Sequence, residues 1–125
     1  MAAVVAFDVG GPVLKWMVAM LTQRVFTIAD ELIQATVTAW ASGLLLDPTG
    51  YAVSWAFQAD GSPPPLADPS WKAGTWDVST TGNYVAQIRS GATGAALAAG
   101  EYYAFIKIAA GSETVVRQIG KVIAR

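Results

Sequence analysis

Two tryptophans, Trp71 and Trp76, lie five residues apart in the stretch DPSWKAGTWDV and are the side chains best placed to bind a ligand. Exposed indole rings on a β-sandwich stack against sugars in many carbohydrate-binding modules. An indole, however, carries a large apolar surface that is usually buried. We therefore expect Trp76, in the run TWDV, to enter the core. Trp71, beside Pro69 and Lys72, is expected to pack over its loop or against a neighbouring chain.

Few side chains are available for catalysis, because the chain contains no His and no Cys. General acid–base chemistry then falls to carboxylates, Lys and Tyr, and a Ser or Thr nucleophile would lack its usual base. The carboxylates are scattered mostly through predicted turns, where solvation accounts for them better than a glycosidase pair does. The sequence therefore predicts no catalytic residues, no cofactor and no enzymatic activity.

Metal and phosphate sites are not indicated either. The loop ADGSPPPLAD offers oxygen atoms of Asp60, Ser62 and Asp68 but lacks the several spaced acids that hold Ca²⁺. The glycines of GATGAALAAG lack the lysine and the following helix of a phosphate-binding loop. We expect no metal ion.

The composition favours a single domain that contacts other chains. A chain of 125 residues is long enough to bury a core without disulfides, and its 8 Lys+Arg against 9 Asp+Glu argue against a nucleic-acid partner. Only 14% of the residues are charged and 54% are hydrophobic, whereas an ordinary soluble domain has about 25% charged residues. So few charged residues predict that part of the surface is covered by other chains, in a homo-oligomer or a larger assembly.

The apolar N-terminal residues are too interrupted to span a membrane, which takes about 20 consecutive apolar residues. The first charge is Asp8, which does not fit the positively charged start of a signal peptide. Residues 1–24 are expected to form an apolar arm or a short helix beginning at Pro12, outside a β-sandwich domain of residues 25–125. This segment either closes the sandwich of its own chain or docks on an adjacent subunit.

A set of apolar and aromatic residues is predicted to make the subunit contacts. Its members are Phe7, Val13, Leu14, Trp16, Met17 and Trp71.

Later segments alternate apolar and polar residues with a period of two, as half-buried strands do. The strand candidates are ELIQATVTAW, YAVSWAFQ, NYVAQIRS, EYYAFIKIA and TVVRQIGKVIA, the last with a bulge or bend at Gly120. The DPTG run has the residues of a type I turn, and the proline-rich run of residues 59–70 predicts a surface loop. Short strands separated by turns predict an all-β, antiparallel, immunoglobulin-like β-sandwich, with a small barrel as the alternative.

Residues 25–125 also resemble a known group of proteins. The segments DPTGYAVSWAF, WKAGTW, NYVAQI, LAAGEYYAFIKI and VVRQIGKVIA are similar to those of small β-sandwich proteins encoded among the virion structural genes of tailed actinobacterial phages. The resemblance implies a non-enzymatic virion component, such as a minor capsid or decoration protein or a neck or tail accessory. Its partners would be capsid or tail proteins, and residues 1–24 lie outside the pattern.

Two functions therefore remain open at the level of sequence. The first is a structural protein of a virion that acts through subunit contacts. The second is a secreted carbohydrate-binding module that uses Trp71, with or without Trp76.

Overall fold

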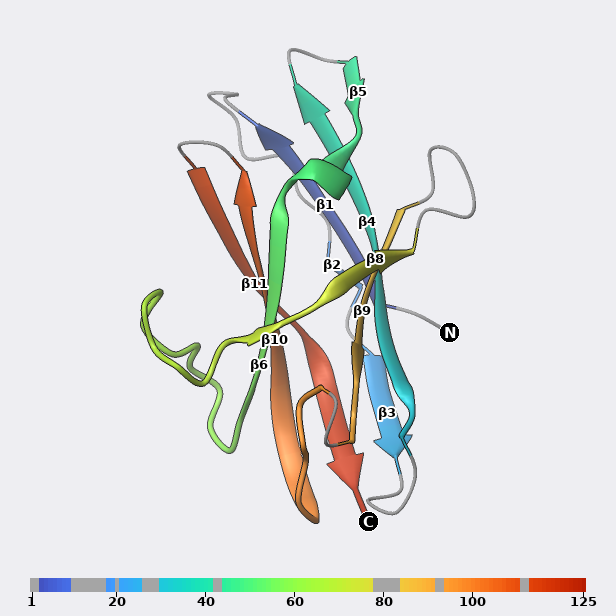
Figure 1. Ribbon diagram of the computed structural model, residues 1–125, viewed down its shortest axis with the longest axis vertical. Helices are drawn as coiled ribbons and strands as arrows, with labels where there is room; N and C mark the ends of the chain where they lie inside the picture. Colours follow the sequence, from blue (N-terminus) through green and yellow to red (C-terminus); the bar gives the residue numbers. More distant parts are fainter. Residues whose placement is uncertain are drawn as a thin grey trace.

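Two β-sheets pack face to face in the computed structural model, which describes residues 3–9, 18–19, 21–25, 30–41, 44–77, 84–91, 94–110 and 113–125 (Figure 1). Sheet A contains β1 (Ala3–Val9), β2 (Val18–Ala19), β4 (Leu32–Ala41), β5 (Leu44–Leu46), β8 (Thr75–Asp77) and β9 (Tyr84–Arg89). Sheet B contains β3 (Leu21–Val25), β6 (Ala52–Gln58), β7 (Lys72–Ala73), β10 (Gly100–Ala110) and β11 (Glu113–Ala124). Within these ranges the structure contains no helix of the length and apolarity needed to cross a membrane.

The strand order is that of an immunoglobulin-like sandwich. Sheet A runs β2-β1-β4-β9-β8, with β5 also paired to β4, and sheet B runs β3-β11-β10-β6-β7. Thus β4, β9 and β8 face β11, β10 and β6, as strands B, E and D face G, F and C in immunoglobulin domains. The predicted all-β sandwich is confirmed.

Two side-chain features of that fold are also present. Trp55, on β6, is fully buried at the position of the core tryptophan of immunoglobulin domains. The Tyr102 hydroxyl, near the start of β10, donates to the backbone oxygen of Ala98 at 2.8 Å, as in a tyrosine corner. Ala104, two residues later, is buried where antibody domains place a disulfide cysteine, so packing alone joins the sheets here.

The core follows the alternation seen in the sequence. On β4 the side chains of Ile33, Ala35 and Val37 are buried while Gln34 and Thr36 are only half-buried. Each fully buried Val or Ile contributes roughly 1.5–3 kcal/mol. Both sheets supply the buried core residues, which are Ile33, Ala35, Val37, Val53, Trp55, Ala86, Ile88, Ala104, Ile106, Ile108, Ile119, Val122 and Ala124.

The DPTG run forms a short 3-10 helix, η1 (Pro48–Gly50), in place of an isolated type I turn. Asp47 caps it by accepting from the Thr49 backbone N–H at 2.9 Å, and the Tyr51 N–H donates to the Pro48 oxygen at 3.0 Å. A 3-10 turn and a type I turn share this spacing of hydrogen bonds, so the predicted reversal of the chain is at the right place.

The last strand contains the predicted bulge. The pairing of β10 with β11 shifts between Ala104, opposite Gly120, and Phe105, opposite Gln118. Gly120 has a φ of +146°, a conformation that side-chain-bearing residues rarely adopt. Glycine at this position therefore allows the long strand to bend without strain.

The described part of residues 1–24 consists of strands in both sheets. β1 runs parallel to β4 along seven residue pairs, and β3 runs parallel to β11 along five. Of the two expectations for this segment, closure of its own sandwich describes these strands, because the backbone edges of β4 and β11 offer them hydrogen-bond partners. The boundary expected after residue 24 falls within β3. Residues 10–17, where a helix was expected from Pro12, lie outside the described residues.

Candidate functional site

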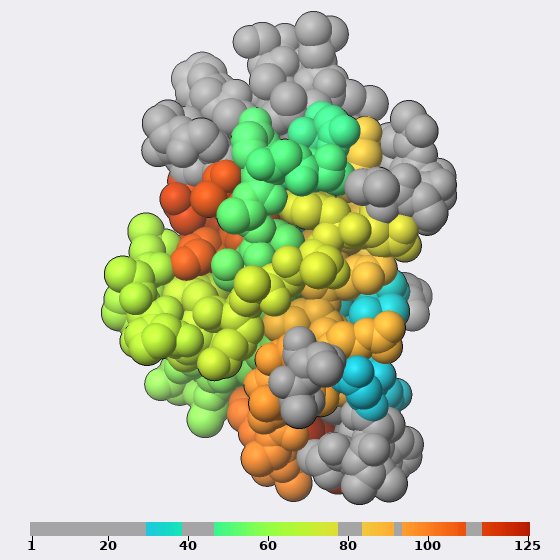
Figure 2. All heavy atoms as spheres, viewed as in Figure 1, coloured from blue at the N-terminus to red at the C-terminus, as the bar shows by residue number. Residues whose placement is uncertain are grey.

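The loop between β6 and β7, residues 59–71 and hereafter the proline-rich loop, stands out from the sandwich on the left of Figure 2. Its second half is a series of tight turns. The Asp68 N–H donates to the Pro65 oxygen at 2.9 Å, the Ser70 N–H donates to Asp68 Oδ1 at 2.8 Å, and the Trp71 N–H donates to the Asp68 oxygen at 3.3 Å. Consecutive prolines restrict the backbone further. Hydrogen bonds among its own residues therefore stabilise the second half of the loop, residues 65–71.

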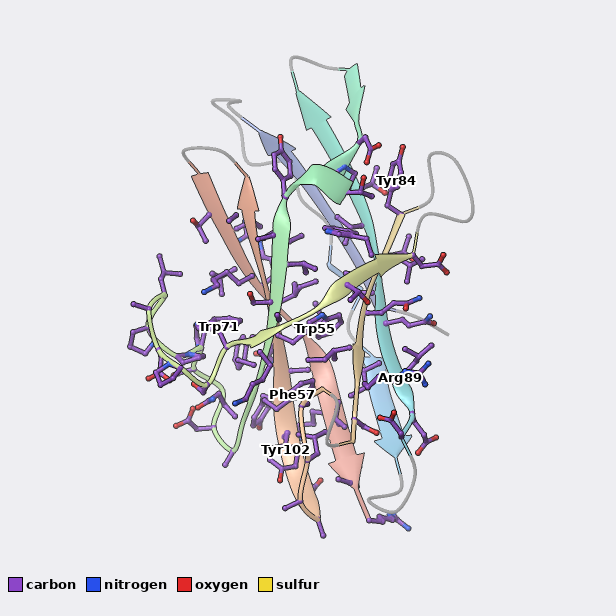
Figure 3. The ribbon with its side chains drawn as sticks, viewed as in Figure 1. Trp55, Phe57, Trp71, Tyr84, Arg89 and Tyr102 are labelled. Atoms are coloured by element: carbon purple, nitrogen blue, oxygen red, sulfur yellow. The ribbon has the colours of Figure 1, made fainter. Side chains whose placement is uncertain are left out.

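Trp71 fastens this loop to sheet B. Its Nε1 donates to the Pro65 oxygen at 2.9 Å, and Lys107 Nζ lies 4.8 Å from the centre of its ring. The same ammonium donates to the Leu66 oxygen at 2.8 Å. Figure 3 shows Trp71 between the loop and the strands of sheet B. Of the two expectations for Trp71, packing over its own loop describes these contacts, with Lys107 over one side of the ring, and a contact with a neighbouring chain stays a prediction.

The contacts of Lys107 place the loop over the outer face of sheet B. Ala56 on β6 and Phe105 on β10 are directly paired on that face, and both are buried although their alternation points them away from the core. In the strand candidate EYYAFIKIA, Phe105 alternates with Ala104 and Ile106, which are core residues. Its burial is not contained in the alternation, which places it on the face opposite Ala104 and Ile106.

Leu66 is the exposed feature of the loop. Among the residues whose side chains are described, it is the one large hydrophobic residue classed as exposed, with 55% of its surface accessible. Its backbone oxygen is held by Lys107, and its neighbour Pro65 accepts from Trp71. A single apolar side chain is thus presented at a fixed place on a protruding loop. In the sequence, the one signal for Leu66 is its place directly after three prolines.

The chain next crosses from one sheet to the other at Gly74. The preceding β7 pairs with β6 in sheet B, and the following β8 pairs with β9 in sheet A. The Gly74 N–H donates to the Val53 oxygen at 2.9 Å. A Cβ atom on Gly74 would lie 2.6 Å from Trp55 Cδ1 and Nε1 and 2.8 Å from the Gln87 oxygen. Only glycine lets the crossing chain lie directly against the indole of Trp55.

Trp76 is directed inward just after this crossing. Its side chain is half-buried against the core, and its Nε1 donates to the Tyr51 oxygen at 2.9 Å. Trp76 therefore packs against the core, on the side that the prediction gave it, but it is half-buried rather than enclosed among the core residues. The two indoles of WKAGTW therefore belong to different surfaces, one to the loop over sheet B and the other to the core.

A cleft of about 360 Å³ opens beside the crossing. Its walls are the crossing segment, the end of β9, the start of β4 and the loop that follows β9. The lining residues are Leu32, Ala73, Gly74, Thr75, Gln87, Ile88, Arg89 and Gly94.

The wall after β9 is formed by residues 90–91 and 94–97, hereafter the post-β9 turn. The Ala95 N–H donates to the Arg89 oxygen at 2.8 Å and the Leu97 N–H donates to the Ser90 oxygen at 3.0 Å. Buried Ser90 ties the turn to β4, since its Oγ accepts from the Glu31 N–H at 3.0 Å. A Cβ on Gly94 would clash with the backbone oxygen of Arg89, so the turn can close only with glycine there. The cleft is consequently formed in advance of any ligand.

Three of the described carboxylates accept hydrogen bonds within the turns in which they lie. Asp47, Asp60 and Asp68 each accept a hydrogen bond from the backbone N–H two residues later. In the described part of the chain no group of three or more acidic, His or Cys side chains is placed to hold a metal ion. Such hydrogen bonds are typical of acidic side chains in surface turns.

Of the residues predicted to make subunit contacts, only Trp71 has a described side chain. Phe7 lies in β1, where the backbone alone is described, and Val13, Leu14, Trp16 and Met17 lie outside the described residues. Their predicted role in assembly stays a prediction.

Acidification is expected to loosen the proline-rich loop. The hydroxyl and then the backbone N–H of Ser70 hold the pKa of Asp68 below its usual value of about 3.9. A lowered folded-state pKa means that this contribution is present above about pH 4 and is lost as the pH falls through the folded pKa. The NMR signal of the Trp71 indole N–H should therefore stay constant from pH 5 to 9 and shift below pH 4.

The matched variants for this titration are Asp68→Ala and Asp60→Ala. Asp68→Ala should shift the Trp71 signal at every pH, whereas Asp60→Ala should leave its acid transition in place. An unchanged Trp71 signal in Asp68→Ala would show that the loop does not depend on this turn.

Comparisons with known proteins yield a likeness of fold. No family model matches the chain, and no curated protein matches it. Among solved structures, the chain is similar to the N-terminal domain of phage TP901-1 ORF48, with a TM-score of 0.45 and 9% sequence identity over 98% of this chain and 96% of that chain. A phage protein domain is thus a structural neighbour of this sandwich, and a likeness at this identity and score does not extend to function.

Proposed function

We propose that the protein is a non-enzymatic structural component of a tailed-phage virion, a minor capsid or decoration protein or a neck or tail accessory, that acts through contacts with other subunits. The observation that carries the proposal is Leu66, exposed on a loop that is stabilised by a hydrogen bond of Trp71 to Pro65 and one of Lys107 to Leu66. A protruding apolar side chain in a fixed position is suited to docking into another protein.

The assignment to a virion rests on the sequence resemblance of residues 25–125. The composition supports an assembled protein, because 14% charged residues leave much of the surface suited to cover by neighbouring chains.

The hydrogen bonds within and beneath the loop favour a role in binding another protein over a role in binding a small ligand. Binding through a mobile loop loses free energy to the ordering of that loop, whereas a pre-ordered loop avoids most of this cost. Trp71, Lys107 and Asp68 are all engaged within the molecule in maintaining that order. The polar groups around the loop are thus used to build a contact surface.

Co-sedimentation with phage particles tests the proposal. Particles assembled without this gene are mixed with the purified full chain and separated on a density gradient. The protein should migrate with the particles and saturate them, and Leu66→Asp should weaken binding by about 30-fold, which corresponds to about 2 kcal/mol at a hot-spot residue.

The control variant for this experiment is Ala59→Asp, which adds a charge at another exposed position of the same loop. It should bind as the wild type does. Failure of the wild type to migrate with particles at any concentration contradicts the proposal, as does glycan binding that Trp71→Ala removes.

A further inference from the structure

We infer that the three consecutive prolines of the loop, residues 63–65 and hereafter the proline run, form with Leu66 a polyproline II ligand that docks into an aromatic-lined groove of another virion protein. This inference rests on the proposed structural function and names the class of partner that the loop would recognise. The run belongs to the protruding loop, and none of its residues lies in a strand or a helix (Figure 2).

The sequence itself sets the backbone conformation of the run. Each proline ring fixes φ at about −65°. A residue that precedes a proline is restricted to extended values of ψ, and Ser62, Pro63 and Pro64 each precede one. Pro63 and Pro64 are therefore confined at both dihedral angles to the polyproline II region. This conformation exists before any partner binds.

The exposure of the run matches a polyproline II segment lying on the surface of the sandwich. Such a helix has three residues per turn, so one residue of each turn faces the molecule and two face away. Pro64 is half-buried, whereas Pro63 and Pro65 are exposed. Leu66 follows directly and is exposed as well. The run thus presents two proline rings and a leucine side chain together as one apolar surface.

The backbone of the run can accept hydrogen bonds but cannot donate them. Proline has no backbone N–H, so these residues are unsuited to pairing as a strand with the edge of a partner's sheet. The Pro65 oxygen already accepts from Trp71 Nε1 and from the Asp68 N–H. The oxygens of Pro63 and Pro64 accept no hydrogen bond from the described residues, which leaves them for donors of a partner.

An aromatic-lined groove satisfies both the apolar surface and the free oxygens. Flat aromatic rings pack against proline rings and leucine, and a Tyr hydroxyl or a Trp indole N–H in the groove can donate to the carbonyl oxygens. Grooves of this kind bind proline-rich segments because the bound conformation is already formed and little entropy is lost.

Charge does not select the partner. Asp60 and Asp68 lie in the loop, while Lys72 follows it and Lys107 contacts it from β10. Charges of both signs therefore surround the run, and recognition falls to the proline rings, Leu66 and the carbonyl oxygens.

The end of the run is attached to the sandwich without covering its exposed surface. Trp71 Nε1 donates to the Pro65 oxygen at 2.9 Å, and Lys107 Nζ donates to the Leu66 oxygen at 2.8 Å. Both contacts are made to backbone oxygens, so they leave the proline rings and the leucine side chain available. Docking then requires little rearrangement of the loop, which favours association.

Pro63→Leu in the full chain separates recognition of the polyproline II backbone from simple apolar contact. Leucine keeps an apolar side chain but restores the N–H and frees φ. In co-sedimentation with particles assembled without this gene, Pro63→Leu should weaken binding by about 10-fold. The matched control is Pro69→Leu, which changes an exposed proline outside the run and should bind as the wild type does. An unchanged NMR signal of the Trp71 indole N–H establishes that the loop is intact.

Photo-cross-linking identifies the surface that contacts the run. The chain has no cysteine, so Ala67→Cys carries a single benzophenone label at an exposed position beside Leu66. The labelled chain is bound to the particles and irradiated, and the adduct is located by mass spectrometry. It should lie on another virion protein, in a segment that contains Trp or Tyr. Replacing that aromatic residue by Ala in the particle should weaken binding by about 10-fold.

Three results overturn the inference. They are wild-type binding by Pro63→Leu, an adduct on a segment without aromatic residues, and an adduct on a second copy of this chain. Any of them, combined with particle binding that Leu66→Asp weakens, rejects the aromatic groove and leaves the proposed virion role standing. Failure of the wild type to bind particles rejects the virion role itself, and the inference with it.

Discussion

Gly74→Ala is expected to lower the free energy of unfolding by about 1–3 kcal/mol, the usual cost of overpacking a core. The added methyl group would lie 2.6 Å from two atoms of the Trp55 indole and 2.8 Å from the Gln87 oxygen. The Trp55 side chain is fully buried and cannot move away freely, and the Gln87 oxygen is a backbone atom of β9. The strain must therefore be relieved by shifting the crossing chain relative to both sheets. Urea unfolding monitored by tryptophan fluorescence measures the change.

Gly61→Ala is the matched control for Gly74→Ala. Gly61 lies in the proline-rich loop, and a Cβ there would have no heavy atom within 4 Å. Alanine at this position restricts the unfolded chain and should leave stability unchanged or raise it by about 0.4–1 kcal/mol. Equal stability of the two alanine variants would contradict the assignment of Gly74 as the tight crossing point.

Trp55→Ala is expected to have the largest effect of any single substitution, a loss of about 3–5 kcal/mol. The indole is buried between the sheets, and its ring lies nearly parallel to that of Phe57 at 6.4 Å between centroids. Because whole domains are stable by only about 5–15 kcal/mol, this variant should be marginally folded at best. Thermal unfolding followed by circular dichroism gives the shift in midpoint.

Phenylalanine substitutions separate the apolar part of this effect from the polar part. Trp55 Nε1 is buried and has no hydrogen-bond partner among the described residues, so Trp55→Phe should cost much less than Trp55→Ala. Trp76→Phe removes a hydrogen bond to Tyr51 and should cost about 0.5–1.5 kcal/mol for that bond, in addition to lost packing. A loss below about 1 kcal/mol in Trp55→Ala is incompatible with a core built around this residue.

The strands could be predicted from the sequence because their information is local. Alternation identified the buried faces of β4, β6, β9 and β10, and a lone glycine in a strand identified the bulge at Gly120. Trp76 was assigned to the core from its place at the start of such a strand. In each case one face buried against another sheet fixes which residues are apolar.

The remaining features depend on contacts between segments far apart in the chain. The pairing of β1 with β4 and of β3 with β11 requires knowing which sheet edges are free, and apolar composition alone does not contain that information. In the sequence Gly74 cannot be told from an ordinary loop glycine, because only the fold shows the Trp55 indole packed against it. The hydrogen bond of Lys107 to the Leu66 oxygen likewise joins residues far apart in the sequence.

In the candidate site, too, some features can be predicted from the sequence and others only from the fold. The sequence singled out Trp71 as the indole on the loop, and the structure explains its place through Pro65 and Lys107. Leu66 and the cleft beside Gly74 emerged only from the fold, because exposure and concavity are properties of the folded surface. The resemblance to virion proteins covers the sandwich and gave no indication of either feature.

Quantitative mass spectrometry of purified particles tests the central claim most directly. Virions of the tailed phage proposed to encode this chain are banded by density, and the amount of this chain is compared with that of the major capsid protein. A structural component should remain with the particles through repeated banding, in a constant ratio that corresponds to several copies per particle. Its absence from intact particles, or its recovery only from the surrounding medium, would contradict a role in virion structure.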